Sequence, residues 1–173
     1  MNETNIPMRR RDRKMSDSEA LELLKNAPYV FMSTADAEGD PYCVPINIVM
    51  TDDETAYIHG MKTGRKIDNI THNPHVCLSY ATSKGTIAST KTKEGFIVEF
   101  KSVVAFGTAS LVDDLDEKKM VLTRMCEQLL DPKLDAYQRI NESVERSAGL
   151  TTIYKIHISS VSGKKNPNDL MSH

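Results

Sequence analysis

The residues with the clearest chemical potential lie between 57 and 66, where the sequence reads YIHGMKTGRK. The first half favours a β-strand, and the glycine-led pair Arg65-Lys66 begins a polar segment of helical character. The first turn of a helix has unpartnered backbone N–H groups and a partial positive charge, which together attract phosphate. A forked arginine beside a compact lysine would strengthen that attraction. The alternative is a surface helix whose two cations simply face water.

Two histidines, His72 and His75, have a spacing that metal ligands could use. The pair spans Asn73-Pro74, which breaks a helix, and no carboxylate or cysteine completes a tetrahedral set at a suitable local spacing. We therefore predict no metal site. No Ser-His-Asp or Cys-His pairing can be argued from the spacing, and the glycine-rich dinucleotide and triphosphate motifs are absent. We assign no catalytic residue.

The composition predicts a soluble protein of one domain. With 173 residues, 39% hydrophobic and 27% charged, the chain can bury a core without disulfides. A net charge of −2 gives no sign of a dedicated nucleic-acid-binding protein. Cys43, Cys77 and Cys126 are an odd number without a C-x-x-C pair, so we expect packing roles and a cytoplasmic location. We expect neither a signal peptide nor a membrane span.

The N-terminal segment carries a basic run, MRRRDRK, at residues 8–14. We predict a solvated basic arm over 1–15, a main domain over 16–165 and a flexible tail over 166–173. A nucleic-acid contact is the alternative interpretation of the basic run. It is disfavoured because aromatic residues make up 6% of the chain and none interleaves with the run.

The main domain shows many closely spaced β-rich runs. Ser16 and Glu19 have capping-box spacing, which predicts a helix that ends before Pro28. Strands are predicted over 29–35 and 42–50, joined as a hairpin by DAEGD, and over 56–60, 75–83, 96–112 and 150–164. Helices are predicted over 64–73, from Asp114 to about residue 130 with a stripe containing Leu115, Leu122 and Leu129, and over 136–148, before Gly149.

Residues 84–95 are rich in Lys, Thr, Ser and Gly, which predicts a mobile loop or a long hairpin tip that could act as a lid. The strand over 96–112 is long and contains Gly107, so it requires a bend or bulge there. Strands and helices do not alternate regularly, which argues against a doubly wound sheet. We predict a mostly β (α+β) fold, an antiparallel barrel with peripheral helices.

Four segments together resemble a known family: YCVPINIVM at 42–50, residues 57–80, FKSVVAFGTASLV at 100–112 and YKIHISSVSGK at 154–164. In this order and spacing they resemble the flavin-binding split β-barrel of the pyridoxamine 5′-phosphate oxidase superfamily, and within it the nitroimidazole-resistance proteins. The resemblance covers roughly residues 8–165. It implies a homodimer with one FMN in each of two clefts between the subunits.

The resemblance also implies cofactor contacts from three segments. The isoalloxazine ring would lie against Val44, Pro45, Ile46 and Asn47. The ribityl phosphate would be held by His59, Lys62, Gly64, Arg65 and Lys66. A further strand would reach the flavin through Lys101 and Ser102. The residue types suit FMN, which needs an apolar wall, backbone partners and cations at its phosphate, and a proline such as Pro45 fits a strand paired on one side only.

The resemblance implies an FMN-dependent oxidoreductase that reduces small nitroaromatic acceptors, with a nicotinamide compound as electron donor. The alternative is a non-catalytic flavin, haem or deazaflavin binding protein, since a fold does not settle function. Oxidation of pyridoxamine phosphate is disfavoured. The chain has no tryptophan and ends in SGKKNPNDLMSH, without the arginine-rich closing segment of those oxidases.

Overall fold

The computed structural model describes residues 8–88, 95–131 and 136–166. The helical elements are the 3₁₀ turns η2 (Arg11–Arg13) and η3 (Tyr137–Arg139) and the helices α1 (Asp17–Lys25), α2 (Arg65–His72), α3 (Leu115–Leu129) and α4 (Ile140–Ser147). The strands are β1 (Val30–Ala35), β2 (Pro41–Ile46), β3 (Val49–Met50), β4 (Thr55–Gly60), β5 (His75–Ala88), β6 (Phe96–Val112) and β7 (Thr152–Asn166). Among the described residues, no helix is both long and apolar enough to cross a membrane.

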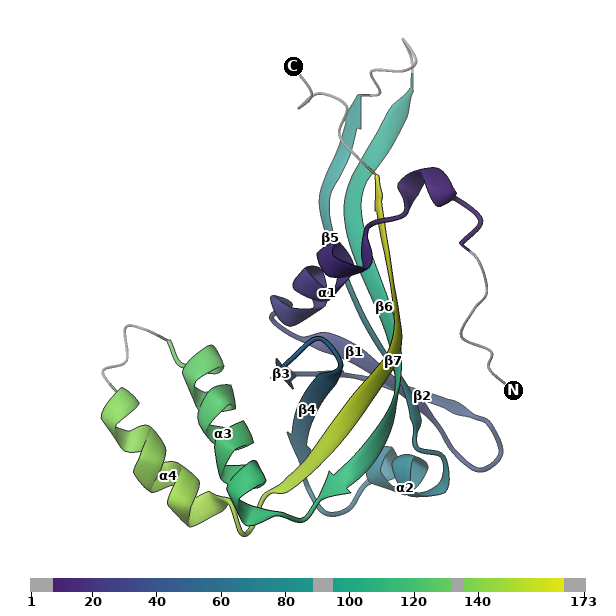
Figure 1. The fold of residues 1–173 in the computed structure, drawn as a ribbon. Helices are drawn as coiled ribbons and strands as arrows, with labels where there is room; N and C mark the ends of the chain where they lie inside the picture. Colours follow the sequence, from purple (N-terminus) through teal and green to yellow (C-terminus); the bar gives the residue numbers. More distant parts are fainter. Residues whose placement is uncertain (1–7, 89–94, 132–135, 167–173) are drawn as a thin grey trace.

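The described strands form one antiparallel sheet in the order β2-β1-β5-β6-β7-β4-β3, which places β2 and β3 at opposite edges. Only Asn47 and Ile48 connect these two strands. In a flat sheet, six spacings of about 4.8 Å would separate the edges by about 29 Å. Three Cα steps reach only about 11 Å, so the sheet must curl until its edges nearly meet. The edges do not pair, and the result is the predicted antiparallel split β-barrel (Figure 1).

The prediction of a single strand over 42–50 is wrong, because this run forms both edge strands. Ile46 is the last residue paired with β1, and Val49 is the first paired with β4. Asn47 lies at the crossing, where its Nδ2 donates to the carbonyl of Pro28 at 2.8 Å. Uniform β-propensity along a run carries no local sign of where the pairing partner changes.

Several local predictions are confirmed. Ser16 and Glu19 form both hydrogen bonds of the capping box. β1 and β2 form the predicted hairpin, and the β6–β7 register shifts at Gly107, where a bulge was predicted. β5 and β6 pair as far as Ala88 and Phe96, as in a long hairpin (Figure 1), whose tip at 89–94 lies outside the described residues.

The predicted domain boundaries stay predictions, since residues 1–7 and 167–173 lie outside the described part of the chain. Two residues of the predicted arm contact the barrel. Lys14 forms an isolated bridge with Lys164, and buried Met15 donates its backbone N–H to the carbonyl of Gly163 at 2.9 Å. Asn166 of the predicted tail belongs to β7.

The main hydrophobic core fills the inside of the curled sheet. Its fully buried members include Leu24 of α1, Met32 of β1, Ile58 of β4, Leu78 of β5 and Ile156 of β7. α1 packs against β6 and β7, and α2 packs against β1. The two helices therefore cover the barrel interior from different sides.

A second core lies beneath α3 and α4, which form a pair on one side of the barrel (Figure 1). It contains Val49, Tyr57, Val112, Val121, Leu122, Met125, Ile140, Val144, Ala148 and Ile153. The predicted buried stripe of α3 is wrong at both ends, since Leu115 and Leu129 are 48% and 46% exposed. Neighbouring stripes fit the helical period equally well, and the position of the sheet decides which one is buried.

The second core has a polar link between helix and sheet. The hydroxyl of Tyr57 donates to Oε1 of Glu117 at 2.6 Å, and Lys155 Nζ lies 3.2 Å from the same oxygen. The Tyr57 hydrogen bond, followed by the Lys155 interaction, holds the pKa of Glu117 below its ordinary value of 4.5. The charged carboxylate is therefore the form that the fold stabilises.

We expect Glu117→Gln to lower the free energy of unfolding by about 1–2 kcal/mol near neutral pH, because a charge-assisted hydrogen bond is weakened. A depressed carboxyl pKa stabilises the fold above the unfolded pKa and loses its effect as the pH falls through the folded value. The difference between variant and wild type should therefore shrink below about pH 4.5. Denaturant titration across pH measures this, with exposed Glu127→Gln on the same helix as control; a difference independent of pH would contradict the prediction.

Candidate functional site

An open cavity of about 360 Å³ lies where β2 faces β4 and α2. We call it the seam pocket, and its lining residues are Tyr42, Val44, Pro45, Ile46, Asn47, His59 and Lys66. β3 pairs with β4 only at Ala56 and Tyr57, so His59 lies beyond the part of β4 that β3 covers. The pocket therefore forms because the sheet curls without closing.

The wall of the seam pocket is an edge strand. Val44, Pro45 and Ile46 belong to β2, which pairs with β1 and with no other described strand. An edge strand leaves backbone N–H and C=O groups available to a ligand, and it tolerates a proline. The expectation that Pro45 lies on a strand paired on one side is confirmed. An apolar surface bordered by backbone donors and acceptors suits a flat heteroaromatic ring.

Lys66 supplies the positive charge of the pocket. Its side chain is half-buried and makes no hydrogen bond or ion pair with the described residues. Burial lowers its pKa, since the charged form loses hydration without gaining a partner. An anion bound in the pocket would supply that partner.

The side chain of Arg65 already makes two contacts that the sequence did not indicate. Its guanidinium lies 3.5 Å from Oδ2 of Asp36, in the β1–β2 turn, and 5.0 Å from the ring centroid of Tyr42. The side chain is about half exposed. Arg65 can still turn toward an anion, but doing so costs these two contacts.

Gly64 gives α2 its abrupt start. It is the N-cap residue with φ 123° and ψ 159°, a conformation that is essentially restricted to glycine. Glycine has no side chain that could bond to the first-turn N–H groups. Ile67 donates its N–H to the carbonyl of Gly64 at 2.8 Å, so the N–H groups of Arg65 and Lys66 are the ones that stay available. The predicted helix start is confirmed, at Arg65.

A buried hydrogen-bonded chain beneath the pocket holds α2 against the sheet. Asn69 Nδ2 donates to Oγ1 of Thr34 at 2.9 Å, and the Thr34 hydroxyl lies 3.4 Å from the carbonyl of Tyr42. Asn69 and Thr34 are both buried. Sequence reasoning missed Tyr42 and Asn69. The available signals were the alternation of Tyr42 with Val44 and the position of Asn69 between apolar residues of α2.

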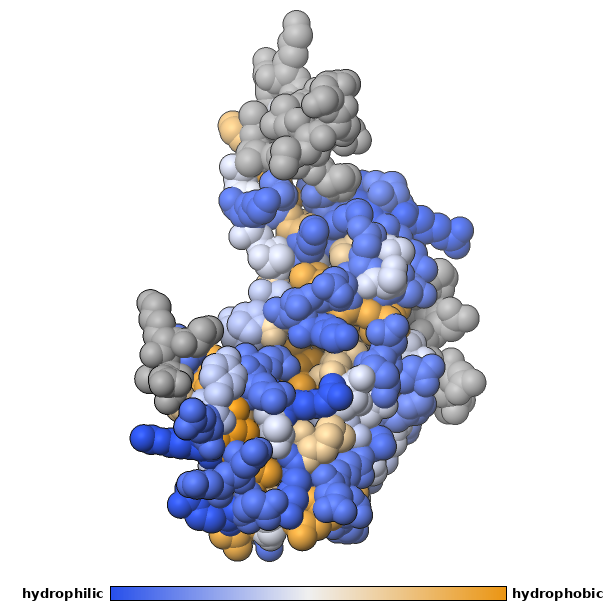
Figure 2. Space-filling view, turned by 60° about the vertical axis from the view of Figure 1, so that its left-hand side comes forward, coloured by the Kyte–Doolittle hydropathy of each residue, from blue (hydrophilic) through white to orange (hydrophobic). Residues whose placement is uncertain are grey.

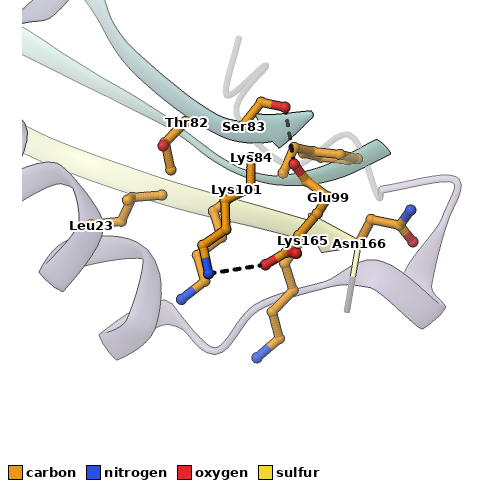
Figure 3. Close-up of a pocket in the computed structure, with 9 residues that line it drawn as sticks. Leu23, Thr82, Ser83, Lys84, Glu99, Lys101, Lys165 and Asn166 are labelled. Carbon is orange, nitrogen blue, oxygen red and sulfur yellow. Dashed lines mark hydrogen bonds and ion pairs between the residues drawn. The ribbon is translucent and has the colours of Figure 1, made fainter. Parts of the chain in front are cut away.

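The structure brings together six of the residues that the resemblance implies: Val44, Pro45, Ile46, Asn47, His59 and Lys66. Lys62 is exposed and does not line the pocket. Lys101 lines a separate cavity of about 350 Å³ with Leu23, Lys84 and Glu99 (Figure 3), where Lys84 pairs with Glu99 at 3.4 Å. Ser102 follows Lys101 on β6, with its Oγ 3.4 Å from the carbonyl of Lys164. Neither residue lines the seam pocket.

Metal ligation has no support in the described part of the chain, where no three His, Cys, Asp or Glu side chains gather into a metal site. His72 uses Nδ1 in a hydrogen bond with the carbonyl of Asp68, at 2.8 Å.

The absence of a side chain at Gly60 leaves space for the side chain of Lys66. A Cβ added at Gly60 would lie 3.3 Å from Nζ and 3.9 Å from Cε of Lys66. We expect Gly60→Ala to displace the ammonium group by a fraction of an ångström and to weaken binding of a phosphate-bearing ligand about two- to fivefold. Gly149→Ala, where an added Cβ meets nothing within 4 Å, is the control. Equal affinities in both variants would show that the Lys66 position does not matter.

The fold and the pocket define a class, the open antiparallel β-barrels with a cavity at the split between their edges. The chain belongs to the pyridoxamine 5′-phosphate oxidase family, whose model matches residues 16–165. No characterised protein matches the sequence significantly in a direct comparison.

Solved structures share the fold. A protein from Bacteroides thetaiotaomicron, described as a 5-nitroimidazole antibiotic resistance protein, is 20% identical with a TM-score of 0.69, over 87% of this chain and 85% of its own. The flavocytochrome Anf3 from Azotobacter vinelandii is 20% identical with a TM-score of 0.76, over 96% and 75%. A FAD- and haem-binding protein from Mycobacterium smegmatis is 16% identical with a TM-score of 0.65, over 90% and 74%.

Proposed function

We propose that the chain binds FMN in the seam pocket, with the flavin ring against β2 and the phosphate at Lys66 and the start of α2. The observation that carries this proposal is the half-buried Lys66, which has no partner among the described residues, at a pocket whose other wall is an apolar edge strand. An FMN phosphate is an anion with strong acceptor oxygens, so it matches an amine that burial has left without a partner. Two of the structural neighbours, the flavocytochrome and the FAD- and haem-binding protein, are also named for a flavin.

We further propose that the bound flavin serves in reduction of small nitroaromatic compounds. The flavin supplies the redox chemistry, taking electrons from a nicotinamide donor so that a nitro acceptor can be reduced. The protein's residues bind and orient: Val44 and Ile46 shield one side of the ring from water, and Lys66 balances the phosphate charge. No side-chain nucleophile is required. The structural likeness to a 5-nitroimidazole resistance protein supports this choice of acceptor.

We propose that two chains form a homodimer through the outer face of the sheet. Phe31 of β1 and Phe106 of β6 are 43% and 41% exposed on that face, and the register places Cys77 and Ser33 between them. Such exposed apolar patches commonly mark interfaces. In a dimer, the partner's copy of Lys101 and Ser102 would be free to complete a flavin site that one chain leaves open. Light scattering on the purified protein measures the mass in solution.

Purification without added cofactor, followed by mass identification of any bound molecule, tests the proposal directly. We expect FMN at up to one molecule per chain, with flavin absorption that bleaches on addition of NADH or NADPH and returns with a nitroimidazole. Bound FMN without turnover would support the binding proposal and contradict the proposed reduction of nitroaromatic compounds. Bound haem or deazaflavin, or no affinity for added FMN, would overturn the assignment.

A further inference from the structure

A further pocket lies between α3 and α4, and the one lining residue that it shares with the seam pocket is His59. It has a volume of about 430 Å³, and its lining is Leu122, Met125, Cys126, Leu129, Leu130, Ala136, Arg139, Ile140 and Ser143, with His59 of β4 at one side. We call it the helix pocket. Figure 2, which turns this side of the molecule forward, shows hydrophobic surface set among hydrophilic side chains on its lower half.

The walls of the helix pocket are apolar, and three of their side chains are buried in the second core. Leu122, Met125 and Ile140 belong to the second core and are at most 9% exposed. Leu129, at 46%, presents an apolar side chain to the opening. The volume lies in the range of pockets that take small organic molecules.

The polar groups at the pocket are few, and they select the charge of a ligand. Arg139 is exposed and its guanidinium makes no ion pair or hydrogen bond with the described residues, so this group is available. Ser143 lies four residues further along the chain, in α4, and offers a hydroxyl. Among the residues that the structure describes, no carboxylate lines the pocket. An apolar cavity with one available guanidinium at its rim is complementary to an aromatic molecule that carries an anionic group.

We infer that the helix pocket is a binding site for a small aromatic anion, such as an aromatic carboxylate or sulfonate. His59 lines both this pocket and the seam pocket. Ligands in the two pockets would therefore both lie next to His59. The inference does not depend on the cofactor, because no residue of the helix pocket other than His59 lines the seam pocket.

Cysteine protection locates the ligand without any substitution. Cys126 lines the helix pocket, whereas Cys43 is exposed and lines neither pocket. The probe is 1-anilinonaphthalene-8-sulfonate, an aromatic sulfonate, used with the purified full-length protein. We expect the probe to slow alkylation of Cys126 by N-ethylmaleimide, followed by peptide mass mapping, and to leave Cys43 unchanged. Equal rates at Cys126 with and without saturating probe would overturn the inference.

Matched variants test the two features of the pocket by probe fluorescence. Leu129→Gln should weaken probe binding about fivefold, since apolar contact is lost. Leu115→Gln, at a similarly exposed leucine on the same helix but outside the pocket, should have no effect. Equal effects of the two substitutions would indicate nonspecific binding to apolar surface and would refute the site.

The charge of Arg139 is tested with a pair of probes. Arg139→Gln should weaken binding of the sulfonate about three- to tenfold and leave binding of its neutral analogue N-phenyl-1-naphthylamine unchanged. Arg146→Gln, at an exposed arginine of α4 that does not line the pocket, is the control. If Arg139→Gln weakens both probes equally, or neither, the anion preference is wrong. Flavin content should stay at the wild-type level in every variant, so failure here is distinct from failure of the FMN proposal.

Discussion

Lys66→Met should lower the affinity for FMN about ten- to a hundredfold, because a hydrogen bond to a charged group contributes about 1.5–3 kcal/mol. Methionine keeps the length of the side chain and removes its charge. In the free protein, the ammonium group is half-buried and has no partner in the described part of the chain, and burial lowers its pKa. A phosphate would restore the lost stabilisation, so binding and protonation of Lys66 favour each other.

This coupling predicts a pH dependence with a definite sign. FMN affinity should fall as the pH rises through the pKa of Lys66, which lies below the ordinary lysine value of 10.5. Quenching of FMN fluorescence on titration with the apoprotein measures both effects. Lys25→Met, at an exposed lysine at the end of α1, is the matched control and should leave the affinity unchanged.

Arg65→Ala provides the comparison that separates the two cations. We expect a smaller loss than for Lys66→Met, because Arg65 must give up Asp36 and the Tyr42 ring before it can bind an anion. A larger loss for Arg65→Ala would mean that the arginine leaves these contacts readily. Arg65, and not Lys66, would then be the main phosphate ligand.

Features with a local chemical cause could be predicted from the sequence. The capping box of Ser16 and Glu19, the β1–β2 turn, the glycine start of α2 and the bulge at Gly107 each depend on a few neighbouring residues. The resemblance extended this to the site, where six implied residues line one pocket. Their binding role is a prediction that awaits the cofactor experiment.

Features set by distant parts of the chain could not be predicted. The run over 42–50 divides between the two edges of the sheet, and only the whole strand order makes that division necessary. The contact of Arg65 with Asp36 joins residues far apart in sequence. No local pattern therefore indicated that Arg65 would have an ion-pair partner and that Lys66 would have none among the described residues. The exposure of Leu115 and Leu129 depends on where the sheet meets α3.

Gly107→Ala should be more destabilising than any of the substitutions above, with a loss of about 3 kcal/mol or more in the free energy of unfolding. Gly107 lies on β6, between β5 and β7, where the β6–β7 register shifts and Ser159 of β7 is left unpaired in the register. An added Cβ would overlap the backbone carbonyl oxygen of His157 and lie 3.0 Å from Cγ2 of Ile156. A neighbouring backbone cannot swing aside as the end of a side chain can, so β6 and β7 would have to separate where they are paired.

The glycine at this position is required by space and not by backbone conformation, since Gly107 has no positive φ. Gly149→Ala is therefore the matched control: its added Cβ meets nothing within 4 Å, and its φ is also outside the left-handed region. We expect Gly107→Ala to lower Tm by about 6–12 °C, and Gly149→Ala to leave Tm unchanged or slightly raised. If the Tm of Gly107→Ala lies within about 2 °C of the wild-type value, β6 and β7 can move apart enough to accommodate a methyl group at little cost in stability. The close approach of these strands would then not be what fixes the bend of the barrel.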